Sequence, residues 1–134
     1  MKERPANDGR QVWYVMSKSA FPGPTFLGIG APKAGTTWLH NQLAYHPDIE
    51  VPSGMKEIQY LNKYWDRGLE WYGGWFSWEG KSTAVRMGEI TPHYLYHPDA
   101  PERAYSLGSV SRLILLVRDP IERAVSHYHH RIGV

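Results

Sequence analysis

Short apolar runs, each bounded by turn residues, divide the chain into regularly spaced segments. The clearest runs lie at 26–30, 84–90 and 112–117, and a shorter one lies at 49–52. Continuous apolar runs of this length are typical of strands that are buried in a parallel sheet. We therefore predict a strand at each of these four positions.

Helical patterns lie between these runs. Residues 36–45 carry leucines four positions apart on one face, and a His-Pro pair ends the pattern. A second short helix is predicted at 98–105. Asp119 can cap a third helix, and Pro120 suits its first position. Strands that alternate with helices predict an α/β fold with a mainly parallel sheet.

The segment 60–78 is crowded with aromatic residues. Trp71, Trp75 and Trp78 recur at helical spacing, although Gly73-Gly74 interrupts them. We interpret these side chains as packing a helix onto the core rather than as a box that holds a ligand.

The composition of the chain argues against several classes of function. The net charge of the 134 residues is only +2, which predicts neither nucleic-acid binding nor attraction to a membrane surface. The chain has no cysteine, so disulfides and thiolate chemistry are excluded. No signal peptide and no apolar run of about 20 residues is visible, so we expect a cytoplasmic protein without a membrane segment.

Residues 1–24 are expected to form an arm, with a short strand at 12–16. Residues 25–134 are expected to form the main domain.

The first chemical motif is the turn at 30–37, with the sequence GAPKAGTT, between the first strand and its helix. Amides at such a turn and the helix dipole form an anion site. The spacing resembles the P-loop of nucleotide triphosphatases. However, Thr36 stands where those enzymes need a lysine, and the lysine of this chain lies three residues earlier, at Lys33.

The second motif follows the strand at 112–117. Arg118 comes directly after that strand, and Ser126 lies about two turns into the next helix. Because both side chains can border the carboxyl end of the sheet, an arginine fork and a hydroxyl there suit a second phosphate.

These two segments resemble the PAPS-dependent sulfotransferase family, in particular its heparan-type and bacterial members. Residues 31–39, APKAGTTWL, are similar to the loop that binds the 5′ end of PAPS (3′-phosphoadenosine-5′-phosphosulfate), and 118–128 are similar to the 3′-phosphate segment R-[DN]-P-x-x-R-A-x-S-x-Y. The resemblance implies a P-loop-like three-layer αβα fold. It also implies these cofactor-binding residues: Lys33, Ala34, Gly35, Thr36, Thr37, Trp38 near the adenine, Arg118 and Ser126.

Two further segments resemble the same family. Residues 56–60 are similar to its K-E-x-x-[FY] segment, which implies that Glu57 is the catalytic base and acts together with Lys33. Residues 88–94 are similar to G-E-x-[ST]-P-x-Y. There we expect Glu89 to orient cationic groups, and His93 is a second candidate for the base.

The resemblance implies transfer of a sulfuryl group from PAPS to a hydroxyl or amine of a glycan, lipid or small metabolite, which leaves PAP. It implies no metal, and the histidine pair at 127 and 130 has no acidic partner in sequence. Family members continue beyond this point, so we expect a partial sulfotransferase domain at 25–134, truncated at its carboxyl end. The alternatives are a P-loop kinase or NTPase, and an anion-binding fragment without catalysis.

Overall fold

The structure is a computed structural model that describes residues 20–79, 81 and 85–133. The strand expected at 12–16, and most of the expected arm at 1–24, lie outside the described residues. All further structural statements concern the described part of the chain.

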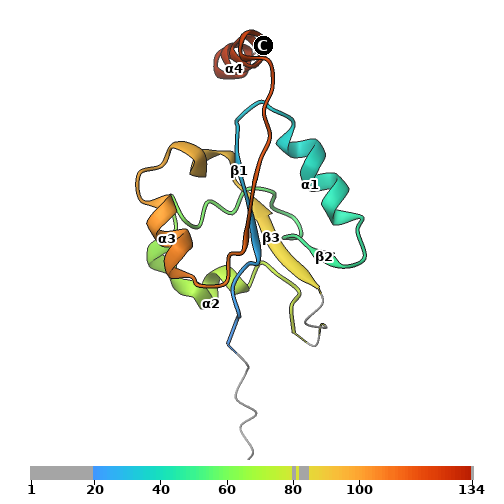
Figure 1. Cartoon of the computed structure of the whole chain (residues 1–134), viewed down its shortest axis with the longest axis vertical. Helices are drawn as coiled ribbons and strands as arrows, with labels where there is room; N and C mark the ends of the chain where they lie inside the picture. Colours follow the sequence, from blue (N-terminus) through green and yellow to red (C-terminus); the bar gives the residue numbers. More distant parts are fainter. Residues whose placement is uncertain (1–19, 80, 82–84, 134) are drawn as a thin grey trace, which may run out of the picture.

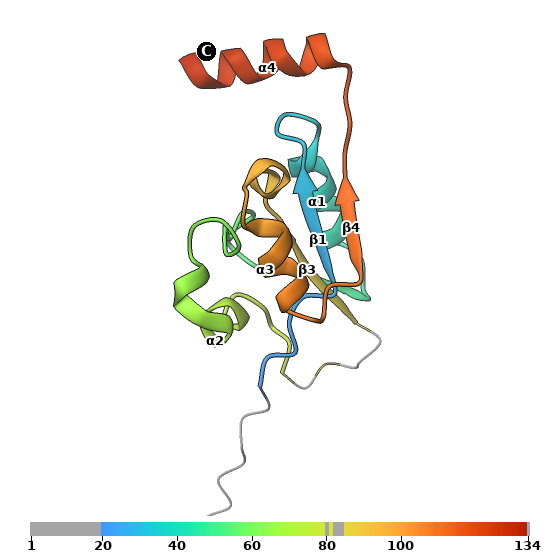
Figure 2. The same ribbon diagram turned by 60° about the vertical axis from the view of Figure 1, so that its left-hand side comes forward.

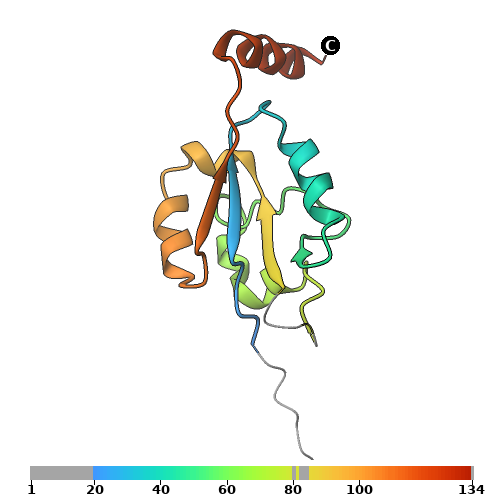
Figure 3. The same cartoon turned by 45° about the vertical axis from the view of Figure 1, so that its right-hand side comes forward.

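Four parallel strands form the sheet, in the spatial order β2-β3-β1-β4. They are β1 (Phe26–Gly30), β2 (Ile49–Glu50), β3 (Arg86–Ile90) and β4 (Arg112–Leu115). Figure 3 shows β4, β1 and β3 side by side, with their arrows pointing the same way. All four predicted strands are present, although β4 ends two residues before the expected position.

Helices cover both faces of the sheet. Figure 1 shows α1 (Thr36–Ala44) on one side, and α2 (Gly68–Gly73) and α3 (Ala100–Ser106) on the other. Two 3₁₀ turns, η1 (Trp65–Arg67) and η2 (Pro92–Tyr96), complete the second side. The predicted α/β fold with a mainly parallel sheet is confirmed.

The aromatic segment packs into the core, as its composition predicts. Tyr72 is fully buried, and its ring stacks on that of Tyr60 with centroids 4.2 Å apart. Phe21 meets the same Tyr72 ring edge-on at 5.9 Å. Burial of an aromatic side chain stabilises a fold by about 1.5–3 kcal/mol. The helix is shorter than the tryptophan spacing predicts, because α2 ends at Gly73 and Trp75 follows it.

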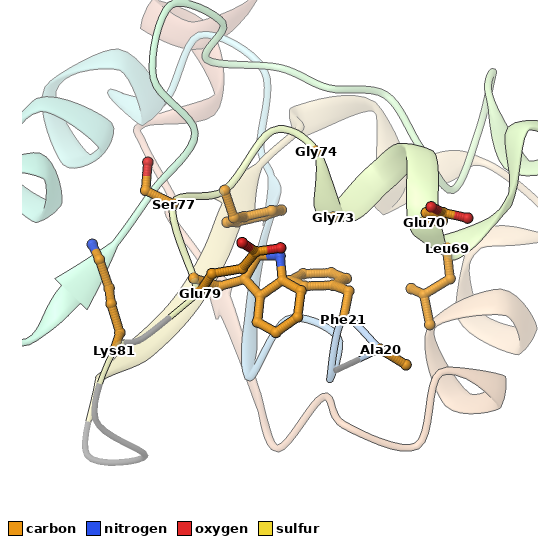
Figure 4. A pocket seen from close by; sticks show the side chains of 11 residues that line it. Ala20, Phe21, Leu69, Glu70, Gly73, Gly74, Ser77, Glu79 and Lys81 are labelled. Atoms are coloured by element: carbon orange, nitrogen blue, oxygen red, sulfur yellow. The ribbon is translucent and has the colours of Figure 1, made fainter. Parts of the chain in front are cut away.

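A hollow beside the aromatic core lies at the amino-terminal end of the sheet (Figure 4). Phe21, Leu69, Glu79 and Lys81 are among the residues that line it. A Cβ atom at Gly73 would lie 2.6 Å from the Phe21 ring, so glycine lets the helix approach this ring closely. Because the hollow lies at the amino-terminal end of the strands, it is remote from both sequence motifs, which lie at the carboxyl end.

Residues 112–132, which we call the β4–α4 region, are much more exposed than the rest. Leu113 is 61% exposed and Val117 82%, and α4 (Pro120–Ile132) has no buried residue. Figure 2 shows α4 apart from the sheet, beyond the carboxyl ends of β1 and β4. The second motif thus lies on the least buried part of the described chain.

Candidate functional site

The loop after β1 has the geometry of an anion site. Gly35 adopts φ 98° just before α1, a left-handed conformation that glycine reaches at little cost, and no described atom lies near the position of a Cβ there. Among the described residues, no side chain caps the start of α1. The first-turn amides therefore remain available to a ligand, and the helix dipole favours a negative charge.

Pairing between β1 and β4 continues into this loop. The amide of Ala31 donates to the carbonyl of Leu116 at 3.0 Å, and the amide of Leu116 donates to Gly30 at 2.8 Å. These bonds fix the start of the loop against the segment that leads to Arg118.

Arg118 joins the two motifs directly. Its Nη1 donates to the carbonyl oxygen of Lys33 at 3.3 Å, and its Nε lies 3.3 Å from a carboxylate oxygen of Glu122. Asp119 caps α4, because its carboxylate accepts from two amides of the first turn at 3.0 Å each. The guanidinium is thereby placed beside the loop, although the two residues are far apart in sequence.

One cavity collects most of the predicted site residues at the carboxyl ends of the strands. Those that line it are Lys33, Gly35, Thr36, Thr37, Glu57, Arg118 and Ser126. The lining also includes Lys56, His93 and Arg131. Among the described residues that line it, Glu57 is the only carboxylate, whereas four are lysines and arginines. This charge balance suits an anionic ligand with one basic group nearby.

Lys56 connects the candidate base to the start of α1. Its Nζ lies 3.0 Å from Glu57 Oε1, and it donates to the hydroxyls of Thr36 at 3.3 Å and Thr37 at 3.0 Å. His93 Nδ1 lies 3.9 Å from the other oxygen of Glu57. Both candidate bases therefore border the same cavity. The sequence places Lys56 beside Glu57 but carries no sign of its contacts with α1, which depend on the fold.

Glu89 has a different environment from the one that the sequence suggests. The side chain is fully buried at the end of β3, and all four of its hydrogen-bond donors are neutral groups: the amide of Ile58 and the hydroxyls of Tyr72, Thr91 and Tyr94. Desolvation raises the pKa of this carboxyl above its ordinary value, although the four donors partly oppose that effect. The expectation that Glu89 orients cationic groups is therefore wrong.

Two predicted residues do not line the cavity. Ala34 lies within the loop, and Trp38 is 64% exposed on α1. A role of Trp38 near an adenine stays a prediction.

The described residues hold no group of three metal-ligating side chains. Across those same residues, we found no helix with the length and apolar character that crossing a bilayer requires.

Known proteins resemble this chain along most of its length. A membrane-associated sulfotransferase, kil1, of Dictyostelium discoideum is 41% identical over 110 residues, which are 81% of this chain and 23% of that protein. The bifunctional heparan sulfate N-deacetylase/N-sulfotransferase 3 of Homo sapiens is 33% identical over 136 residues, which are 96% of this chain and 16% of that protein. The chain thus spans less than a quarter of the length of these two relatives.

The fold has a solved counterpart. The crystal structure of a sulfotransferase from Alicyclobacillus acidocaldarius matches with a TM-score of 0.68 and 26% identity, over 83% of this chain and 51% of that one. The family model described as the sulfotransferase domain matches residues 24–134, a range that includes both sequence motifs and the whole described sheet. The chain therefore belongs to the sulfotransferase family.

Proposed function

We propose that this chain carries the donor site of a PAPS-dependent sulfotransferase. The reaction is the transfer of a sulfuryl group from PAPS to a hydroxyl or amine of an acceptor, with PAP as the second product. The observation that carries the proposal is the shared cavity, in which Lys33, Glu57 and Arg118 meet at the carboxyl ends of the strands.

The chemistry of the cavity suits a cofactor with two anionic ends. Lys33 and the hydroxyls of Thr36 and Thr37 border one part, where the α1 amides are available. Arg118 and Ser126 border the other part, and an arginine fork with a hydroxyl suits a phosphate. We assign the 5′ end of PAPS to the first part and its 3′-phosphate to the second.

Each residue then has a separate task in the reaction. PAPS, when bound, supplies the sulfuryl group. Lys33 and the loop amides stabilise the negative charge that develops at the 5′-phosphate. Glu57 accepts the proton of the acceptor, while the ammonium of Lys56, 3.0 Å away, holds the carboxylate beside the loop. Arg118 and Ser126 fix the position of the cofactor along the cavity.

A glycan is the first acceptor class to test. The human relative is named for N-sulfation of heparan sulfate, and a mouse relative that is 35% identical over 107 residues is named as a heparan sulfate glucosamine 3-O-sulfotransferase. A cytoplasmic location stays the prediction from the sequence.

Calorimetry with PAP tests the donor site without any knowledge of the acceptor. The purified protein is titrated with PAP in EDTA and, separately, with ATP and magnesium. We expect metal-independent binding of PAP that is weakened by both Lys33→Ala and Arg118→Ala. A preference for ATP with magnesium would favour the P-loop kinase or NTPase alternative.

The catalytic part of the proposal needs a second assay. Labelled PAPS is incubated with heparan sulfate that carries free amino groups, and incorporation of label into the glycan is measured. A protein that binds PAP but transfers nothing to any hydroxyl or amine acceptor would match the alternative of an anion-binding protein without catalysis.

A further inference from the structure

The segment that carries Glu57 has little regular structure of its own. Between β2 and η1, residues 51–64 form no helix or strand. Gln59 adopts φ 57°, a left-handed conformation that is uncommon and unfavourable for a residue with a side chain. Buried backbone amides in such a segment need partners from elsewhere in the protein.

Side chains from the end of β3 and from η2 provide those partners. The amide of Ile58 donates directly to Glu89 Oε2 at 3.1 Å. The amide of Gln59 donates to the hydroxyl of Thr91 at 3.3 Å, and the amide of Leu61 donates to the hydroxyl of Tyr94 at 3.2 Å. Three amides within four residues of Glu57 are therefore satisfied by one short stretch of chain, 89–94.

Each of these two hydroxyls in turn donates a hydrogen bond to Glu89. Because Thr91 Oγ1 accepts from an amide, its proton is free to point to Glu89 Oε2, 2.7 Å away. Tyr94 Oη likewise donates to Glu89 Oε1. One buried carboxylate therefore collects three amides of the 58–61 segment, one directly and two through hydroxyl relays.

We propose that Glu89, acting through Thr91 and Tyr94, is the positioning residue that holds Glu57 in the cavity. The proposal rests on the proposed function, in which Glu57 is the base. Glu89 pairs in register with Leu27 of β1, the strand that leads into the phosphate loop. The same pair of strands thus sets the position of the base and that of the loop that binds the donor.

The relay explains why a buried carboxylate occupies this position. An apolar side chain would cost nothing to desolvate but would leave the amide of Ile58 and all three hydroxyls without their acceptor. A carboxylate has enough lone pairs for all four donors. An amide side chain would instead point its NH₂ group, itself a donor, at some of them.

Thr91→Val tests the relay, with Tyr72→Phe as the matched control. The valine side chain keeps the shape of threonine but cannot accept from Gln59 or donate to Glu89. Tyr72 also donates to Glu89 Oε1, at 3.0 Å, but its hydroxyl bonds no amide of the 58–61 segment. Each variant therefore removes one hydroxyl from the same carboxylate, and only the first breaks a relay.

Two readouts are measured on the full-length protein: kcat for sulfuryl transfer from PAPS, alongside the Kd of PAP, and hydrogen exchange of the amides at 58–61. For Thr91→Val we expect kcat to fall about tenfold or more, an unchanged Kd of PAP, and at least about tenfold faster exchange. Thr91→Ser restores the hydroxyl and should recover both values, and Tyr72→Phe should change neither. Tyr94→Phe, which breaks the other relay, replaces Thr91→Val if that variant does not fold.

Equal losses of kcat in Thr91→Val and Tyr72→Phe would overturn the proposal, because a purely structural role predicts no difference between them. If the unaltered protein neither binds PAP nor transfers sulfuryl groups, the proposed function fails. The exchange rates then still decide the positioning role: unchanged exchange in Thr91→Val would overturn it, and faster exchange in that variant alone would support it.

Discussion

The two halves of the cavity are built in different ways. On the side of the phosphate loop and the candidate base, Thr36 is 6% exposed and Glu89 and Ile58 are fully buried. On the side of Arg118, no residue of α4 is buried, and the Arg118 side chain itself is 41% exposed. The first half is held by strand pairing and buried hydrogen bonds. The second half is joined to β1 by the pairing that reaches Leu116, and beyond it by a helix cap and two contacts of a guanidinium group.

Because of this difference, we expect the two halves to affect different quantities: one the rate of transfer, the other the affinity for PAP. Groups that act on the reacting atoms need a fixed position, and we expect the buried half to provide it through Glu89 and the β1–β3 pairing. A group that only binds a phosphate tolerates a less restrained position, because an exposed arginine can adjust to its ligand. Substitutions in the buried half should therefore lower kcat, and those in the β4–α4 region should mainly raise the Kd of PAP.

The largest effect is expected for Lys33→Ala. In the proposed function, loss of the ammonium group removes a positive charge that stabilises the departing 5′-phosphate, so kcat should fall by about 10³-fold or more. Lys63→Ala is the control, because Lys63 is exposed and contacts the ring of Tyr64 outside the cavity. Turnover of Lys33→Ala within about tenfold of the unaltered protein would contradict the assigned role.

Glu57→Gln should have the next largest effect. The amide keeps the shape of the side chain but cannot take a proton, so kcat should fall about 10²- to 10⁴-fold while the Kd of PAP stays the same. His93→Ala is measured in parallel, because His93 Nδ1 lies 3.9 Å from Glu57. Normal turnover by Glu57→Gln together with an inactive His93→Ala would move the role of base to His93.

Arg118→Ala should act on affinity. A hydrogen bond to a charged group contributes about 1.5–3 kcal/mol, so the Kd of PAP should rise roughly 10- to 100-fold, with a smaller loss of kcat at saturating PAPS. Arg112→Ala is the control in the same region, because that exposed guanidinium donates to the nearby carbonyl of Ser111. An unchanged Kd of PAP in Arg118→Ala would contradict the assignment of the 3′-phosphate to this half of the cavity.

The smallest expected effect is a pH dependence of stability. Burial raises the pKa of Glu89 above its ordinary value of 4.5, so the folded protein keeps this proton at a pH where the unfolded chain has released it. The free energy of unfolding should therefore fall, relative to Glu89→Gln, as the pH rises through the raised pKa. Urea titrations of both proteins from about pH 4 to about pH 8 measure the difference, and an opposite slope would contradict the assignment.

The sequence predicts the strands, the helices and the turns that carry both motifs well, because these depend on local patterns. The run 26–30 forms β1, the turn at Gly35 starts α1 as expected, and Asp119 caps α4. The resemblance also leads to Glu57, which lies in the same cavity as Lys33. The site roles themselves, including that of Trp38, stay predictions.

Side-chain contacts between distant segments cannot be predicted in the same way. The sequence suggests a polar, cation-binding Glu89, since nothing in the segment 88–94 shows that Tyr72 will pack against it. Lys56 stands out in the sequence only as part of a motif, because its bonds to Thr36 and Thr37 exist only after α1 and the 51–64 segment have come together.

The contact between Arg118 and the Lys33 carbonyl would link the two proposed subsites of the donor thermodynamically. A ligand that draws the guanidinium toward its 3′-phosphate would change the restraint on the loop to which we assign the 5′ end. Arg118→Ala should then also change the Kd of adenosine 5′-phosphate, a fragment that lacks the 3′-phosphate that we assign to Arg118. The size of that change gives the coupling energy between Arg118 and the loop, because the substitution removes the contact with the Lys33 carbonyl. The proposed donor site acts as one cooperative unit to the extent that this energy differs from zero.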